Sequence, residues 1–198
     1  MYSQSDEEAV ILRHFAGAAS GRYLDVGAYD GRTFSNTLAL VERGWGGCCV
    51  EPSPKPLAAL AGLHRGRANT MVVAAALALR DGPVRLHDAG GDAVSTTDEH
   101  HRDVWQAAGV PYHPLWVWGI SWETLGSIAG WEYQFLSLDT EGTNLALLRA
   151  MPPYLWSSLS LICVEKDTPE ARDATLTELS AHGFALVHET AENLLGAR

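Results

Sequence analysis

The feature that most constrains this chain is the segment over residues 23–33, Tyr-Leu-Asp-Val-Gly-Ala-Tyr-Asp-Gly-Arg-Thr. An apolar run with Asp25 near its end leads into Gly27 and Gly31, which predicts a strand, a glycine-containing turn and the start of a helix. Glycine admits positive φ and lets a ligand approach the backbone closely. Because a helix N-terminus offers free N–H groups and a positive dipole end, we expect this turn to hold a carboxylate or a phosphate.

Apolar runs and helical patterns alternate along most of the chain. Strands are predicted at 22–27, 45–51, 70–76, 133–139 and 159–165, and helices at 5–16, 34–43, 54–63, 143–151 and 168–182. Residues 184–188 and 193–196 are predicted to close the sheet as an antiparallel pair. The strands are almost continuously apolar, as parallel strands covered on both faces are, so the pattern predicts an α/β doubly wound sheet.

Residues 78–131 depart from this alternation. Arg80-Asp81-Gly82 lies between two short extended runs, which predicts a hairpin over 77–87. A loop-like stretch rich in Gly, Asp, Thr and His follows, with a short helix near 100–108, an aromatic extended run at 114–120 and a helix at 121–129. We interpret 78–131 as an insertion that covers the site, within one domain spanning residues 1–198.

Composition narrows the classes of partner. The chain has 198 residues, 46% of them hydrophobic, which suits one globular core. The formal net charge of -10 makes free nucleic acid a poor partner, since phosphate binding needs a basic face, and favours a small or neutral acceptor. The sequence shows no signal-peptide pattern and no apolar segment long enough to span a membrane, and it does not indicate the oligomeric state. Three cysteines without metal-site spacing favour buried thiols, so we expect a cytoplasmic protein without a membrane partner.

Acidic residues follow three of the predicted strands, at the edge where open α/β sheets bind ligands. Asp25, Glu51 and Asp139 stand at those strand ends. An acid after the second strand can accept both hydroxyls of a ribose, so Glu51 predicts an adenosine ligand. Tyr29 stands where the dinucleotide fingerprint has its second glycine, which disfavours NAD and FAD. S-adenosylmethionine fits better, because its carboxylate suits the helix N-terminus and its ammonium suits an acid.

Four motifs occur in the order and spacing of one known family. They are Ser3-Gln4, Leu24-Asp25-Val26-Gly27-Ala28-Tyr29-Asp30-Gly31, Val50-Glu51-Pro52-Ser53 and Leu138-Asp139-Thr140-Glu141-Gly142. Over nearly the whole chain the sequence resembles the FkbM-type methyltransferases, class I S-adenosylmethionine-dependent enzymes that are generally O-methyltransferases of sugars and natural products. The resemblance implies a Rossmann-like, mainly parallel seven-stranded sheet with an antiparallel final strand. One position departs from the family, since Asn144 stands where a second acid is frequent.

The resemblance also implies a set of site residues. Gly27, Ala28, Gly31 and Asn36 would border the methionine end, Glu51 would hold the ribose, and Ala75 and Ala76 would lie beside the adenine. Asp139 would face the sulfonium and the acceptor. The full set expected to contact S-adenosylmethionine is Gln4, Asp25, Gly27, Ala28, Tyr29, Gly31, Asn36, Glu51, Pro52, Ser53, Ala75, Ala76 and Asp139.

Methyl transfer to an aliphatic hydroxyl needs a base within reach of its proton. Asp139 and the imidazoles of His100, His101 and His113 are the candidates. A divalent metal such as Mg²⁺ that acidifies the hydroxyl is an alternative, with hard oxygen ligands among Asp139, Glu141, Glu165 and Asp167. A protein that binds S-adenosylmethionine without transferring the methyl group is a second alternative. A nucleic-acid methyltransferase is disfavoured, because the chain lacks Asn/Asp-Pro-Pro-Tyr after the fourth strand.

Overall fold

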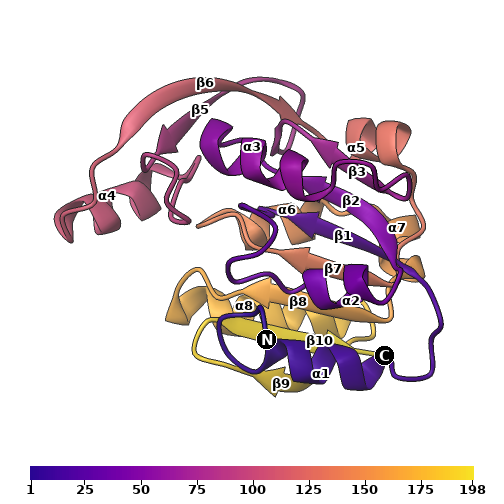
Figure 1. The fold of residues 1–198 in the computed structure, drawn as a ribbon. Coiled ribbons are helices and arrows are strands. Elements are labelled where there is room, and N and C mark those ends of the chain that lie inside the picture. The colour runs from indigo at the N-terminus through magenta and orange to yellow at the C-terminus, as the bar shows by residue number, and fades with distance from the viewer.

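The computed structural model describes the backbone of residues 1–198 and the side chains of residues 1–168 and 171–198. A seven-stranded sheet runs through it in the order β3-β2-β1-β7-β8-β10-β9 (Figure 1). Its strands are β1 Arg22–Val26, β2 Gly46–Val50, β3 Thr70–Val73, β7 Phe135–Leu138, β8 Leu161–Glu165, β9 Ala185–Glu189 and β10 Asn193–Ala197. Both pairings of β10, with β8 and with β9, are antiparallel, and the other pairings in this sheet are parallel. The predicted fold class, including the antiparallel final strand, is confirmed.

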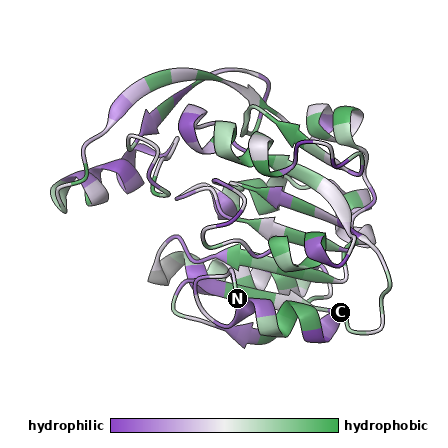
Figure 2. Cartoon of the chain, in the orientation of Figure 1, coloured by the Kyte–Doolittle hydropathy of each residue, from purple (hydrophilic) through white to green (hydrophobic). Residues whose placement is uncertain are grey.

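Helices cover both faces of this sheet. They are α1 Glu7–His14, α2 Leu38–Glu42, α3 Pro54–Leu63, α5 Trp122–Ala129, α6 Asn144–Ala150, α7 Pro153–Ser158 and α8 Pro169–Ala181. A further helix, α4 Glu99–Ala107, lies outside these two layers and has no buried residue. One hydrophobic cluster joins the sheet to α1, α2 and α3, and a second joins it to α5, α6, α7 and α8. Alternate residues of β1 show the division, because Tyr23 belongs to the first cluster and Leu24 to the second. The apolar strands in Figure 2 therefore lie between two helical layers.

A second, three-stranded sheet has the order β4-β6-β5, built from β4 Ala76–Leu77, β6 His113–Ile120 and β5 Gly82–Asp88. The predicted hairpin over 77–87 is wrong, because β4 pairs in parallel with β6 and β5 pairs antiparallel with the same strand. Asp81 explains the turn, since its carboxylate accepts from the N–H of Ser121 and the hydroxyl of Thr124 at the start of α5. The turn is therefore tied to α5 rather than closing a local hairpin.

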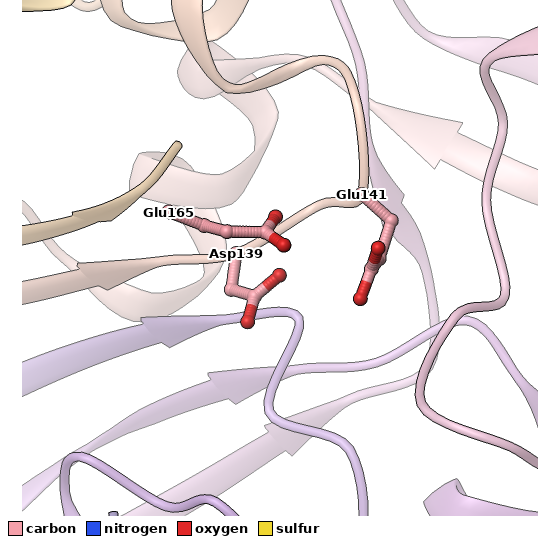
Figure 3. Close-up of side chains that lie close together, drawn as sticks. All are labelled: Asp139, Glu141 and Glu165. Atoms are coloured by element: carbon pink, nitrogen blue, oxygen red, sulfur yellow. The ribbon is translucent and has the colours of Figure 1, made fainter. Parts of the chain in front are cut away.

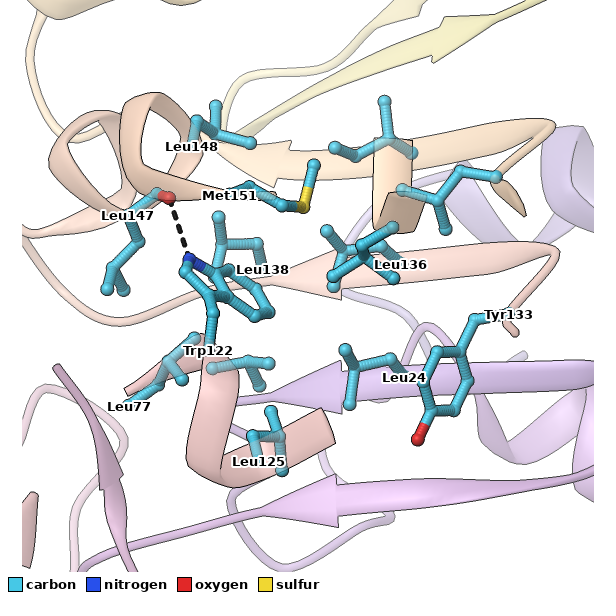
Figure 4. Close-up of a cluster of buried hydrophobic side chains, with 14 of the residues drawn as sticks. Leu24, Leu77, Trp122, Leu125, Tyr133, Leu136, Leu138, Leu147, Leu148 and Met151 are labelled. Carbon is cyan, nitrogen blue, oxygen red and sulfur yellow. Dashed lines mark hydrogen bonds between the residues drawn. The ribbon is translucent and has the colours of Figure 1, made fainter. Parts of the chain in front are cut away.

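The segment 78–131 contributes to two parts of the molecule. The sheet of β5 and β6, with α4, arches beside the carboxyl edge of the main sheet (Figure 1). The helix α5 instead enters the main core, where the indole N–H of Trp122 donates to the carbonyl of Leu147 at 2.9 Å (Figure 4).

The segment after the glycine turn differs from its prediction. The sequence predicts a helix from residue 34, but Phe34 has a positive φ of 58° and α2 begins only at Leu38. Asp30 instead closes a tight turn by accepting from the N–H groups of Arg32 and Thr33. We call residues 27–37 the first loop; its length separates α2 from the glycine turn.

Two smaller expectations concern cysteines and membrane spans. Cys48, Cys49 and Cys163 are buried free thiols, as predicted. Across the described residues, the structure contains no helix with the length and apolar character required to span a membrane.

Candidate active site

A cavity of about 810 Å³ lies at the carboxyl ends of β1, β2, β7 and β8, under residues 92–98 and α4. It brings together most of the side chains predicted to form the site. Those lining it are Gln4, Asp25, Gly27, Ala28, Tyr29, Asn36, Glu51, Pro52, Ser53, Ala75, Ala76, His100, His101 and Asp139. Three other candidates, Ser3, Gly31 and His113, do not line it.

Gly31 has another role than the one expected of it. Its φ is +74°, and a side chain there would meet Leu60 and Leu63 of α3 at 2.6 and 2.9 Å. This glycine therefore lets the first loop pack on α3 rather than admitting a ligand. His113 is exposed at the start of β6, and Ser3 is buried at the N-terminus.

The backbone N–H groups at the glycine turn are already used by the protein. Gly27 and Ala28 both donate to the carbonyl of Val50, at 3.0 and 3.1 Å, and Tyr29 donates to Glu51. The expectation of a helix N-terminus that holds a carboxylate or phosphate here is wrong. The turn instead binds the first loop to the end of β2, which fixes the wall of the cavity.

Glu51 is held in one orientation at the end of β2. Its Oε2 accepts from the N–H of Tyr29 at 2.9 Å, and its Oε1 accepts from the N–H of Ser53 at 2.7 Å. Burial, with smaller effects from the charges of Asp25 and Asp88, raises the pKa of Glu51 to about 7. Each oxygen keeps a second lone-pair site, so the carboxylate can still accept from a ligand hydroxyl.

Asp25 and Asn36 line the same wall but are bound within the protein. Burial raises the pKa of Asp25 to about 6, and its carboxylate accepts from the hydroxyl of Thr37, the N-cap residue of α2. The amide of Asn36 donates to the hydroxyl of Ser137 at 3.3 Å. Both side chains therefore brace the first loop against the sheet.

Three carboxylates converge where β7 and β8 end. Asp139, Glu141 and Glu165 each offer an oxygen, and these oxygens lie within 4.8 Å of one another (Figure 3). Burial raises the pKa of Asp139 to about 7, and the neighbouring charge of Glu141 adds to the effect. Burial also raises the pKa of Glu141 to about 7 and raises that of Glu165. Like charges this close and this buried share protons at neutral pH.

His101 of α4 reaches across to this acid cluster. Its Nε2 lies 2.6 Å from Oε2 of Glu141 and 2.9 Å from the indole nitrogen of Trp105. Burial disfavours the imidazolium, but the contact with Glu141 and the nearby acids outweigh it and raise the pKa of His101. His100 lines the cavity from an exposed position and has no such partner among the described side chains.

Asn144 stands at the position where the predicted FkbM-type motif has a second acid, and its amide organises the acids around it. Its Oδ1 accepts from the N–H of Thr140, while its Nδ2 donates to Glu165 at 3.2 Å and to Asp167 at 2.6 Å. Asp167 also accepts from the N–H of Gly142. Because position 144 carries a neutral amide that bridges two carboxylates, the cluster contains one buried negative charge fewer than it would with an acid at this position.

Several cavity residues had no individual signal in the sequence. Residues 92–97 form the roof because distant contacts hold them, such as the hydroxyl of Thr96 donating to the carbonyl of Glu141. Glu192, between β9 and β10, also lines the cavity. Val104 and Trp105 could have been suspected from the apolar side of the predicted helix that carries His101.

The buried acids lead to a testable dependence of stability on pH. Glu51, Asp139 and Glu141 have folded-state pKa values raised to about 7, whereas unfolded carboxyl groups titrate at about 4. Between pH 8 and 6.5 the folded state takes up protons that the unfolded state does not. The free energy of unfolding should therefore increase by about 1–2 kcal/mol as pH falls over this range, and the melting temperature by several degrees.

Thermal unfolding of wild type and Asp139→Asn at both pH values checks this expectation. The variant has one titrating acid fewer, so its melting temperature should be higher at pH 8 and depend less on pH. The range ends at pH 6.5 because burial lowers the pKa of His64, whose protonation favours the unfolded state below that pH. A melting temperature that is constant or falls towards pH 6.5 would contradict the burial of these acids.

Several solved structures have a fold similar to that of this chain. "Methyltransferase FkbM" from Methylobacillus flagellatus KT has a TM-score of 0.61 and 14% identity, covering 91% of this chain and 44% of that one. A putative RNA methyltransferase from Pyrococcus horikoshii has a TM-score of 0.53 and 10% identity, covering 98% of this chain and 82% of that one. Ribosomal protein L11 methylase from Lactobacillus delbrueckii subsp. bulgaricus has a TM-score of 0.54 and 10% identity, covering 96% of this chain and 75% of that one.

The fold is that of Rossmann-like methyltransferases. This chain spans less than half the length of the FkbM structure, and identities of 10–14% show the fold alone. No protein-family model matches the chain. No curated protein matches it either. Membership of the FkbM family therefore stays a prediction from the four motifs.

Proposed function

We propose that this protein transfers the methyl group of S-adenosylmethionine to a hydroxyl of a small acceptor, a sugar or a secondary metabolite. One observation carries the proposal. In a methyltransferase-type sheet, a single cavity joins the oriented carboxylate of Glu51, after β2, to the buried carboxylate of Asp139, after β7. The FkbM-type motifs that contain these two residues support the same reaction class.

The residues of the cavity fit this cofactor. The buried Oδ1 of Asp139 accepts from no N–H or hydroxyl group of the described residues, so apart from a proton shared with Glu165 it is open to a donor or a positive charge brought by a ligand. The small apolar side chains of Ala75 and Ala76 leave room for a flat base near Glu51. When bound, S-adenosylmethionine would supply an electrophilic methyl group on a sulfonium cation, and an acid-lined cavity favours that charge.

Asp139 and His101 are the groups of this chain suited to take the acceptor's proton. Asp139 has a pKa of about 7, and a pKa near neutral suits a general base that works at neutral pH. His101 is oriented by Glu141 and lies on the same side of the cavity as Trp105 and Val104. These two α4 side chains provide an apolar wall for the acceptor.

The charges of the cavity favour a neutral or cationic acceptor. Acids predominate among its lining residues, and Lys166, which also lines it, is paired with Glu189 at 3.2 Å. One solved structure of this fold is named as a putative RNA methyltransferase, so the fold itself admits nucleic acid. A polyanion would nevertheless meet repulsion here, and we therefore propose a small-molecule acceptor.

Mg²⁺ is not part of the proposal. The acid cluster supplies oxygens that a hard cation accepts, but Glu141 already contacts His101 and Glu165 already accepts from Asn144. Proton sharing among the three carboxylates accounts for their proximity without a further group.

Replacement of Glu51 by glutamine tests cofactor binding. We expect Glu51→Gln to weaken binding of S-adenosylhomocysteine about 10- to 100-fold, because an amide replaces a charged acceptor of two ribose hydroxyls. Calorimetric titration measures the dissociation constant, with exposed Glu132→Gln, outside the cavity, as the matched control. An unchanged constant would remove the ribose assignment. Binding without turnover of any hydroxylated acceptor would favour the non-catalytic alternative.

A further inference from the structure

Glu7, at the first position of α1, is a fully buried carboxylate outside the cavity, with 0% of its surface exposed. It accepts from the hydroxyl of Thr190 at 2.7 Å, from the amide of Asn193 at 3.0 Å and from the N–H of Ser5 at 2.9 Å. Burial alone would raise its pKa, but these hydrogen bonds outweigh burial and lower it. A charge is retained in the interior only when its partners are this complete.

These bonds fasten the N-terminal strap, which we define as residues 2–6, to the turn between β9 and β10. The hydroxyl of Ser5 donates to Glu192 at 3.0 Å, and Asp6 lies 2.7 Å from His188. At its other end the hydroxyl of Tyr2 donates to Glu42 of α2 at 2.7 Å. Figure 1 shows the N-terminus beside β10, although the two segments are almost the whole chain apart in sequence.

The strap carries one cavity residue between its two attachments. Gln4 lines the cavity, and so does Glu192, which accepts from the hydroxyl of Ser5 in the strap. Glu192 directly precedes β10, on the opposite side of β1 from β2, which Glu51 directly follows, and Gln4 is the neighbour of Ser5 in the chain. An amide that can donate and a carboxylate that can accept match the two charged groups of an α-amino acid.

We propose that Glu7 is a positioning residue that, by clamping the strap to the β9–β10 turn, holds Gln4 and Glu192 where the amino-acid part of the cofactor binds. This inference rests on the proposed function, because it takes S-adenosylmethionine as the ligand. Glu7 does not line the cavity, so its effect passes through Gln4 and Glu192.

A double-mutant cycle tests whether the effect of Glu7 passes through Gln4. We expect Gln4→Ala and Glu7→Gln each to weaken S-adenosylhomocysteine about tenfold in calorimetric titrations, and the double variant to be no weaker than the weaker single variant. Methylthioadenosine lacks the amino-acid part, so its dissociation constant should not change in any of the three. Glu178→Gln, on α8 and outside the cavity, is the control for loss of a structural carboxylate contact.

The outcomes separate this inference from the function it rests on. Additive effects of the two substitutions, or equal weakening of methylthioadenosine, would overturn the role of Glu7. If Glu7→Gln does not fold, Thr190→Val removes one of its hydrogen bonds and takes its place in the same cycle. Wild-type protein that binds none of these adenosyl compounds would overturn the proposed function itself and the inference with it.

Discussion

Asp139→Asn is expected to lower the rate of methyl transfer by a factor of about 10²–10⁴ while leaving the protein folded. The amide has the size of the carboxyl group but cannot take a proton from the acceptor. Asp139 is suited to that step because burial and the charge of Glu141 raise its pKa to about 7. Single-turnover transfer from labelled S-adenosylmethionine, to the acceptor that a panel of sugars and natural products identifies, measures the effect.

Two comparisons make this result specific. Asp173→Asn changes an exposed acid of α8, 85% exposed, and should leave the rate unchanged. His101→Gln removes the other candidate base, so the variant with the larger loss and the altered pH–rate profile identifies the group that takes the proton. Full turnover by Asp139→Asn would refute its role as base. Loss of wild-type activity in chelator, restored by Mg²⁺, would reassign Asp139 as a metal ligand.

Gly27→Ala is expected to destabilise the protein by more than about 4 kcal/mol, enough to abolish the folded state or displace the segment after β7. A Cβ at this position would overlap the carbonyl oxygen of Asp139, and the backbone φ of +78° is unfavourable for alanine. The flexible far end of a side chain could move aside, but a backbone carbonyl at the end of a central strand cannot.

Gly44→Ala is the matched control for this substitution. Gly44 has a similar φ of +89°, but nothing lies within 4 Å of the place that a Cβ would take, so alanine should cost only about 1–2 kcal/mol. The difference between the two variants, measured by denaturant unfolding, isolates the close approach of the first loop to Asp139. Equal costs would contradict that contact.

Helices and strands with local signals are predicted well from the sequence. The helix over 54–63 has the predicted bounds, because Pro54 at its first position marks its start, although the hydroxyl of Ser53 donates to the distant Asp88 instead of capping the helix. The hairpin predicted over 77–87 is wrong because β4 and β5 do not pair with each other. Each pairs with β6, which begins more than thirty residues after β4 ends. A turn motif indicates where the chain reverses, but not which strand it will meet.

The same division holds at the site. Glu51 and Asp139 could be placed from the sequence, because strand ends in a parallel sheet share one edge. The hydrogen bonding of the first loop could not be predicted from the sequence. The carbonyl of Val50 accepts from the N–H groups of Gly27 and Ala28, which a ligand was expected to use. Only an account of each donor in the folded structure reveals that competition.

By itself the sequence determined the α/β sheet, the edge that carries the site and the acids that line it, because strand patterns, turn glycines and helix starts act over a few residues. Tertiary structure alone decided which of those acids share protons, which glycine meets a backbone instead of a ligand, and how Glu7 joins the N-terminus to Thr190 and Asn193. Those outcomes depend on burial and on contacts between segments far apart in the chain. Nothing in a local pattern encodes them, since their energies arise only when the segments meet.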